Sequence, residues 1–248
     1  MKKGILFNLF VFGICTFVIG QTSKTVSNFE EFKNAVSEQV ETIILSADIV
    51  ATSEVSLSGK LVVKGNGHTY SVEKPGVSES GLIEATPTSG FRLFTLLYGA
   101  DVTLEGMTLM GGAFKEGNGG IVSVSSGAKL NINNSELTRT IALTGGAIIN
   151  AGALSMKKVI IRRNFANAGG AIYNIGGAAR LFADNIALVE NRTLAEKGSG
   201  GALYNYSGAA AYFNNATISN NQANYEGGAI SNVSNSSAVY LTNTTGTG

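Results

Sequence analysis

Gly169-Gly170-Ala171-Ile172-Tyr173-Asn174 is one of four closely related hexapeptides in this chain of 248 residues. In every copy an Asn follows the first Gly by five residues. A degenerate fifth copy, Gly119-Gly120-Ile121, carries Val124 where the Asn would stand. Self-similarity at a near-constant period is the signature of a solenoid, whose repeats pack only on their neighbours. The other three full copies are Gly145-Gly146-Ala147-Ile148-Ile149-Asn150, Gly200-Gly201-Ala202-Leu203-Tyr204-Asn205 and Gly227-Gly228-Ala229-Ile230-Ser231-Asn232.

A second landmark, a Gly-Ala pair, separates these hexapeptides. It begins 7 or 8 residues after the first Gly of a hexapeptide, and 10 residues after it in the last repeat, where Ser237-Ala238 stands in its place. From a Gly-Ala pair to the next hexapeptide the distance varies from 17 to 23 residues, so insertions collect on one side of the repeat. Successive Gly-Ala pairs are 25 to 31 residues apart, and they begin at Gly99, Gly127, Gly152, Gly177 and Gly208.

Within each unit, apolar and polar residues alternate over short runs, as in Leu130-Asn131-Ile132-Asn133 and Val239-Tyr240-Leu241. This period of two is typical of half-buried strands, and the Asn and Gly residues between the runs suit sharp corners. The chain has only 2 Pro, which fits strands that must donate backbone N–H groups to their neighbours. We therefore predict an all-β fold, a right-handed parallel β-helix whose coils stack about 4.8 Å apart.

The position of the repeated Asn follows from this geometry. If Ile172 points into the coil, Asn174 two residues on does too, whereas Tyr173 between them points outward. We predict that the Asn side chains stack in the interior as a ladder and bond to one another and to backbone groups at the corner. A column of Asn that binds sugar is the alternative. The ladder would comprise Asn150, Asn174, Asn205 and Asn232.

Residues 1–20 have the pattern of a secretory signal peptide, with Lys2 and Lys3 before an apolar run that ends at Ile19. We predict that the chain is exported, either secreted or held at the cell surface, with no membrane-spanning segment after signal cleavage. The single cysteine, Cys15, lies within this segment, so the mature chain would contain no thiol and no disulfide.

Residues 21–41 are predicted to form an N-terminal cap. Ser27-Asn28-Phe29-Glu30 is typical of a capping box, and an amphipathic helix with Phe29, Phe32, Val36 and Val40 on one face would follow it. Such a helix would cover the apolar end of the first coil. Residues 42–98 would form irregular first coils, and residues 99–248 the regular repeats.

The last repeat opens with a strand from Ser237 to Thr242 but has no Gly-Gly pair after it. We expect the chain to be truncated there, with further coils and an anchoring domain downstream. An uncovered last coil exposes unpaired strand edges. We therefore expect end-to-end self-association.

The Gly-Gly-Ala-Ile segments resemble the repeat of the polymorphic outer-membrane proteins first known from chlamydiae, which pairs that tetrad with an upstream Phe-x-x-Asn. Here aliphatic residues replace the Phe. The N-terminal helix and the turn Lys64-Gly65-Asn66-Gly67-His68-Thr69 are similar to the opening of pectate-lyase-like β-helix domains. The resemblance implies an outer-membrane-associated, adhesin-like or structural passenger. The upstream elements are Ile161-Arg162-Arg163-Asn164, Leu188-Val189-Glu190-Asn191 and Ile218-Ser219-Asn220-Asn221, with Leu137-Thr138-Arg139-Thr140 as a weaker copy.

A polysaccharide lyase on the same fold is the alternative function. It would need clustered carboxylates for Ca²⁺ or for acid–base chemistry, with a positioned Arg or Lys. The charged residues instead predict exposed ladders with one cross-coil ion pair, and Asp184 lies near the column of Lys157 or Lys158. His68, the only His, has no partner for a catalytic site. We therefore predict a non-enzymatic protein without catalytic residues, metal or cofactor. One column aligned on the upstream Asn contains Arg139, Arg163, Glu190 and Asn220.

A net charge of +1 gives no reason to expect nucleic acid, so the predicted partner is an extracellular or host-cell glycan or protein. Tyr173 and Tyr204 point outward on consecutive coils, where they would stack a ligand or pair with each other across the strands. The fourth repeat has an insertion, residues 194–199, that should project from the coil as a loop, and this loop and residues 222–226 are candidate binding segments. The candidate binding face is Tyr173, Tyr204, Leu194, Glu196 and Lys197.

Overall fold

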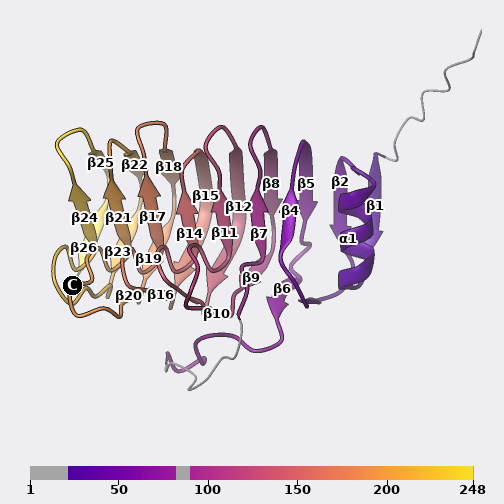
Figure 1. The fold of residues 1–248 in the computed structure, drawn as a ribbon, viewed down its shortest axis with the longest axis horizontal. Coiled ribbons are helices and arrows are strands. Elements are labelled where there is room, and N and C mark those ends of the chain that lie inside the picture. Colours follow the sequence, from indigo (N-terminus) through magenta and orange to yellow (C-terminus); the bar gives the residue numbers. More distant parts are fainter. Residues whose placement is uncertain (1–21, 82–89, 248) are drawn as a thin grey trace, which may run out of the picture.

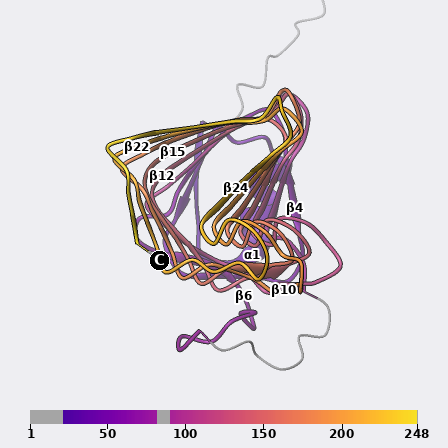
Figure 2. The same cartoon turned by 90° about the vertical axis from the view of Figure 1, so that its left-hand side faces the viewer.

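The structure is a computed structural model that describes residues 22–81 and 90–247, so the predicted signal peptide lies outside the described residues. These residues form an elongated stack of β-coils that runs from the N-terminal coil at one end to the C-terminal coil at the other (Figure 1). Viewed along the stack, the coils superpose on one closed outline (Figure 2). The prediction of an all-β fold of stacked parallel coils is confirmed.

The longest row of strands forms one side of the stack, here called the long face. Its strands pair in parallel from coil to coil. In order along the stack they are β1 (Ser23–Val26), β2 (Thr42–Leu45), β5 (Lys60–Lys64), β8 (Asp101–Glu105), β12 (Lys129–Thr138), β15 (Ala153–Arg162), β18 (Arg180–Asp184), β22 (Ala210–Asn214) and β25 (Ala238–Thr242).

Three further rows complete the coils. The first of these rows continues the second halves of β12 and β15 along the stack, and its strands pair with them directly or through a neighbouring strand. It contains β3 (Ile49–Ala51), β6 (Thr69–Val72), β9 (Thr108–Met110), β19 (Ala187–Val189), β23 (Thr217–Ser219) and β26 (Thr245–Thr247). A short sheet contains β10 (Ala113–Phe114), β13 (Ile141–Ala142), β16 (Phe165–Ala166) and β20 (Arg192–Thr193). The Gly-Gly face contains β4 (Val55–Leu57), β7 (Phe94–Leu96), β11 (Val122–Val124), β14 (Ile148–Asn150), β17 (Ile172–Ile175), β21 (Leu203–Tyr206) and β24 (Ile230–Val233).

The repeated hexapeptides lie in register on the Gly-Gly face, with Ile172 beside both Ile148 and Leu203. The two glycines have different physical roles. The first, such as Gly169, has a φ of +61°, which suits a residue without a Cβ. The second, Gly170, approaches the next coil so closely that a Cβ would lie 2.2 Å from the carbonyl oxygen of Gly201. The invariant spacing therefore reflects a corner and a close coil-to-coil contact.

The alternation of polar and apolar residues sends every second side chain into the core. In β18, Leu181 and Ala183 are buried, whereas Phe182 points outward and is 48% exposed. One continuous apolar core runs through the coils from Val26 to Ile218. Burial of one face of each strand, repeated coil after coil, supplies the main stabilisation of a fold that has only one helix among the described residues.

The helix α1 (Phe29–Ser37) lies at the N-terminal end of the stack (Figure 1). Its N-cap is Asn28, whose side chain accepts a hydrogen bond from the Glu31 N–H at 3.0 Å, and Glu31 in turn accepts from the Ser27 N–H at 2.7 Å. The predicted capping box is thus displaced by one residue, because Asn28 keeps an extended backbone and the helix begins at Phe29.

The buried face of α1 also differs in detail from the prediction. Phe29, Phe32 and Ala35 are buried, and Val36 is only partly buried against the core. Val40 is buried but lies beyond the helix end, where its N–H bonds to the carbonyl of Ala35 at 3.2 Å. The helix still covers the core of the first coils, as expected for a cap, since the Phe32 ring lies 5.0 Å from that of Tyr70.

Residues 73–81, which follow β6, leave the coil outline (Figure 2), and the repeat pattern does not predict this. Val77 from this segment forms a small separate core with Ala113, Ile141 and Phe165. The Arg139 guanidinium donates to the carbonyl of Val77 at 2.6 Å and fixes the segment against the short sheet. Residues 42–98 therefore contain regular coils and one excursion, not merely irregular coils.

Candidate functional site

The structure places the repeated Asn at the corner between the Gly-Gly face and the long face. Asn150 donates to Asn174, and Asn174 donates to Asn205, in both cases at 2.7 Å. Each Nδ2 also approaches a backbone carbonyl of the long face, as Asn174 does with Ala210 at 3.2 Å. These three side chains are fully buried. A buried ladder cannot offer its amides to a sugar, so the geometry favours a structural role.

Asn232 differs from the other members of the ladder. It accepts a hydrogen bond from Asn205 at 2.8 Å, as the ladder requires, but its residue is exposed. The reason is its place in the final coil, where no described coil covers it. The inward stack therefore holds for its first three members and reaches the surface at the fourth.

A second Asn ladder, which the sequence did not predict, lies in the upstream elements of the repeat. The Nδ2 of Asn164 donates to Asn191 at 3.1 Å, and that of Asn191 donates to Asn221 at 3.0 Å. The same amides bond to the carbonyls of Leu137 and Ile161 in the preceding coil. The fixed Asn of the upstream motif was the signal that could have revealed it.

The acidic residues lie mostly in pairs with basic or amide groups. Glu190 accepts from Arg163 at 2.6 Å, which is a cross-coil ion pair. Asp184 is in register with Lys157, but it accepts from the Asn214 and Asn215 amides instead. A cross-coil ion pair therefore forms between Arg163 and Glu190, whereas Asp184 pairs with amides because those on β22 and its corner reach the carboxylate.

No group of three or more His, Cys, Asp or Glu side chains is placed to hold a metal ion in the described parts of the chain. His68 contacts Asp48 with its Nδ1 at 3.3 Å, and a hydrogen bond from the Thr69 N–H, followed by the contact with His68, lowers the pKa of that carboxyl below its usual range. This pair closes a turn between neighbouring coils.

The predicted tyrosine pair stacks across the Gly-Gly face. The ring centroids of Tyr173 and Tyr204 are 5.2 Å apart with an angle of 15° between the planes, and Tyr206 lies 6.0 Å from Tyr204. Burial, followed by neighbouring Tyr hydroxyls, raises the pKa of Tyr173 and of Tyr204 above the usual range. The pair is half-buried and lies beside a third Tyr, so the geometry favours pairing across the strands over ligand binding, the two roles that the sequence left open for Tyr173 and Tyr204.

The predicted loops are held against each other. The Asn224 side chain donates to the carbonyl of Ala195 at 3.0 Å, and the Tyr225 N–H donates to Gly198 at 2.9 Å. Leu194, Glu196 and Lys197 are exposed, as expected for a projecting segment. Ser199, however, is buried and its carbonyl accepts from Gly169, so it belongs to the coil.

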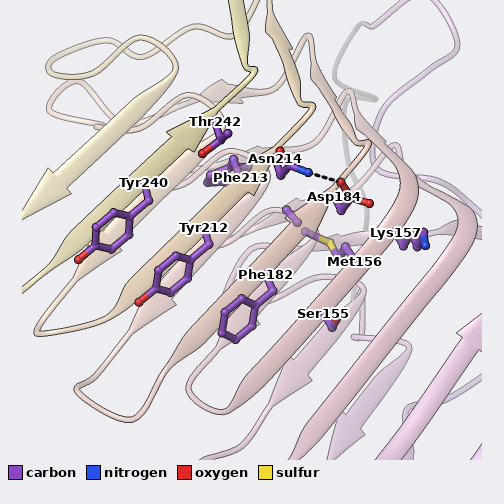
Figure 3. Close-up of a pocket in the computed structure, with 11 residues that line it drawn as sticks. Ser155, Met156, Lys157, Phe182, Asp184, Tyr212, Phe213, Asn214, Tyr240 and Thr242 are labelled. Atoms are coloured by element: carbon purple, nitrogen blue, oxygen red, sulfur yellow. Dashed lines mark hydrogen bonds between the residues drawn. The ribbon is translucent and has the colours of Figure 1, made fainter.

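A different set of aromatic side chains lies on the outer side of the long face, and the repeat spacing did not predict it. Phe182, Tyr212 and Tyr240 lie in one row on β18, β22 and β25, pointing away from the core (Figure 3). Their ring centroids are 5.0 and 4.7 Å apart, and their planes diverge by only 8° and 5°. We call these three residues the aromatic ladder.

The stacked rings of the aromatic ladder must be offset from one another. Aromatic planes in contact lie about 3.5–4.0 Å apart. Parallel rings whose centroids are 4.7–5.0 Å apart are therefore displaced sideways, which leaves part of each ring face open. Phe182 is 48% and Tyr240 53% exposed, and Tyr212 between them is partly buried, so a ligand can reach the outer part of each ring.

A groove of about 350 Å³ runs beside the aromatic ladder. The opposite side of the groove is a polar row at the next outward position of each strand, and Figure 3 shows the two rows side by side. The polar row comprises Lys157, Asp184, Asn214 and Thr242.

The signal for this surface was present in the sequence as three tripeptides, Phe182-Ala183-Asp184, Tyr212-Phe213-Asn214 and Tyr240-Leu241-Thr242. An alignment of the repeats on their Gly-Gly pairs does not bring these three aromatic residues into one column. Phe182 and Tyr240 follow the first Gly of their hexapeptides by 13 residues, but Tyr212 follows by 12, because the corner after Tyr206 is shorter. Only the coil-to-coil pairing shows that the three rings share one column.

The fold and surface define an elongated parallel β-solenoid with an open aromatic side. Residues 215–233 match the family model of the Chlamydia polymorphic membrane protein repeat, and this confirms the resemblance drawn from the sequence for that repeat. A polymorphic membrane protein repeat on a β-solenoid indicates an exported surface protein.

Among solved structures, L. reuteri 53608 SRRP aligns with 90% of this chain and 99% of its own, at 13% identity and a TM-score of 0.43. The comparison with curated proteins gives no match. Within residues 22–81 and 90–247, no helix has the length and apolar character needed to cross a bilayer.

Proposed function

We propose that this chain is an exported, adhesin-like surface protein that holds a binding surface on a rigid solenoid. The observation that carries this function is the aromatic ladder with its neighbouring groove on the long face. Exposed aromatic rings in a row are costly in water unless they serve recognition or packing. Backbone bonds from coil to coil hold them rigidly, so little conformational entropy is lost when a partner binds.

An adhesion assay tests this function. Beads coated with the chain are applied to epithelial cells and to immobilised extracellular matrix, and retention under flow is measured. We expect the triple variant Phe182→Ser, Tyr212→Ser, Tyr240→Ser to lose retention by about tenfold, because aromatic anchors dominate most binding surfaces. The matched control is Tyr173→Ser with Tyr204→Ser, which removes a stacked pair from the Gly-Gly face and should leave retention unchanged. Equal retention of the triple variant and the unchanged chain would contradict the proposal.

The non-enzymatic character is part of the same proposal, with a polysaccharide lyase as the alternative. Two acidic side chains support it because they already have hydrogen-bond partners: Asp184, in the groove, bonds to two amides, and Glu136, on β12, bonds to Arg162. Incubation with pectin and related polymers, followed by ultraviolet absorbance of unsaturated products, tests it. Ca²⁺-dependent product formation would establish the lyase instead.

A further inference from the structure

The groove beside the aromatic ladder has the chemistry of a glycan site, and we propose that it binds a neutral, equatorially linked glycan chain lying along the solenoid axis. This inference rests on the proposed function and names its ligand. Three properties of the groove support this inference. They are the accessible aromatic rings on one side, the net charge of zero in the polar row on the other side, and the distance between successive coils.

The aromatic side of the groove matches the flat face of a sugar ring. A pyranose ring with equatorial substituents presents C–H groups on its two faces and hydroxyls at its edge. The C–H groups carry slight positive charge, and an aromatic face is negative, so the two attract as they pack. The offset rings of Phe182, Tyr212 and Tyr240 present part of an aromatic face on each of three consecutive coils.

The polar side of the groove matches the hydroxyl edge of the same sugar. Asn214 uses its Nδ2 to bond to Asp184 at 2.8 Å, which leaves its Oδ1 as an acceptor for a hydroxyl. Thr242 adds an exposed hydroxyl in the next coil. The groove lining contains one cation, Lys157, and one anion, Asp184, so its formal charges balance. A neutral ligand fits this balance better than a polyanion.

The spacing of the groove selects a glycan over a peptide. Neighbouring coils lie about 4.7–4.9 Å apart. One ring of an extended, equatorially linked glycan is slightly longer than this spacing, so over the three coils of the aromatic ladder each sugar stays near one aromatic side chain. An extended peptide advances about 3.3 Å per residue. It would fall out of step with the aromatic ladder within two residues.

Calorimetric titration of the purified chain with a hexamer of β-1,4-linked glucose tests the proposal. The chain contains no Trp and 8 Tyr, so tyrosine fluorescence gives a second readout of binding at Tyr212 and Tyr240. We expect binding by the unchanged chain. Tyr212→Ser removes the middle ring and should weaken it by about tenfold, the loss expected for a central aromatic anchor. Tyr204→Ser, the control on the Gly-Gly face, should bind as the unchanged chain does.

Two further ligands define the class. The α-1,4-linked glucose hexamer curves away from a straight groove, so it should bind about tenfold more weakly than the β-linked hexamer, a difference of about 1.4 kcal/mol. Polygalacturonate tests for acidic chains. If it binds while the β-linked hexamer does not, and if Lys157→Ala or added salt removes that binding, the neutral class is wrong.

The remaining outcomes also decide the question. Absence of binding to the β-linked hexamer, or equal losses in Tyr212→Ser and Tyr204→Ser when both variants unfold at the midpoint of the unchanged chain, would overturn the glycan site. If adhesion still depends on the aromatic ladder in that case, the proposed function stands and the partner is not a glycan. If adhesion is also independent of the aromatic ladder, both fail.

Discussion

At the residue scale, a polar side chain inside a solenoid can be satisfied by its own copies in the coils above and below. Asn174 accepts from Asn150 and donates to Asn205 and to the carbonyl of Ala210. All four hydrogen-bonded groups lie where water cannot reach, and each unpaired group would be costly.

Asn174→Ala should therefore lower the free energy of unfolding by about 1–3 kcal/mol, because it removes the acceptor of one Asn150 N–H and the donor to the buried Oδ1 of Asn205. Chemical denaturation measures this. The control is Asn167→Ala, at an exposed position of the same repeat, which should change the free energy of unfolding little. Equal denaturation midpoints for the two variants would show that the ladder does not stabilise the fold.

Tyr70 is the opposite case, a polar group buried without a partner. Its ring packs between Phe32 and Phe94, with centroids 5.0 and 4.8 Å away, and its hydroxyl has no hydrogen-bond partner in the described structure. Tyr70→Phe should therefore raise the free energy of unfolding by about 1–2 kcal/mol, since it removes an unsatisfied hydroxyl without removing the ring. Tyr98→Phe, at a residue that is 85% exposed, is the control and should change nothing measurable. A destabilised Tyr70→Phe variant would mean that the hydroxyl does find a partner.

The burial of Tyr70 also predicts that the free energy of unfolding falls at alkaline pH. Burial raises the pKa of Tyr70 above its ordinary value of 10.0, so the folded chain holds this proton more tightly than the unfolded chain does. The free energy of unfolding is thus unaffected below pH 10 and should fall as the pH rises above it, when only the unfolded chain loses the proton. Denaturation at a series of pH values should show a shallower fall in Tyr70→Phe. Identical slopes would contradict the assignment.

At the element scale, the Gly-Gly pair fixes how closely two coils approach. A Cβ on Gly170 would meet the carbonyl oxygen of Gly201 at 2.2 Å and the N of Arg192 at 2.6 Å, and both atoms belong to the backbone of the next coil. Gly177, in the corner before the long face, has no heavy atom within 4 Å of the same hypothetical Cβ and no positive φ. The two glycines therefore differ only in what surrounds them.

Gly170→Ala should lower the free energy of unfolding by about 1–3 kcal/mol, because two packed coils must separate to admit one methyl group. Gly177→Ala should be neutral or slightly stabilising, since Ala restricts the unfolded chain more than Gly does. Thermal unfolding followed by circular dichroism compares the two. If Gly170→Ala is tolerated as well as Gly177→Ala, the Gly-Gly pair is not required for close stacking.

At the scale of the whole molecule, the two ends of the stack differ. Helix α1 covers the first coils, but within the described residues no element covers β24, β25 and β26. Leu241 occupies the inward position that Phe213 holds one coil earlier, yet it is 54% exposed where Phe213 is 2% exposed. An apolar strand edge of this kind promotes association between chains.

We therefore expect the chain to self-associate as its concentration rises, with the last coils in contact. Leu241→Lys should reduce association, because a charge at an inward edge position disfavours further stacking. Thr245→Lys adds the same charge at an exposed position of β26 and should have a smaller effect. Light scattering over a concentration series measures the mass. A monodisperse monomer at every concentration would contradict the expectation.

Much of this architecture is determined locally, and the sequence therefore revealed it. A residue that needs a positive φ, such as Gly169, or that has no room for a Cβ, such as Gly170, is Gly in each of the coils that carry the hexapeptide. A fully buried amide must be repeated if it is to be satisfied by its copies, as in Asn150, Asn174 and Asn205. Repetition imposed by stacking is what made the coils, the register and the first Asn ladder predictable.

The candidate site was decided only by the tertiary structure. Phe182, Tyr212 and Tyr240 are far apart in the chain and are not equally spaced from the Gly-Gly pair, since the corners before them differ in length. Outward side chains are free of the packing that repeats the core, so no fixed spacing marks them. The parallel pairing of β18, β22 and β25 absorbs the corner difference and brings the three rings into one column. Sequence thus determined what each coil buries, and the pairing of coils determined which exposed side chains lie side by side.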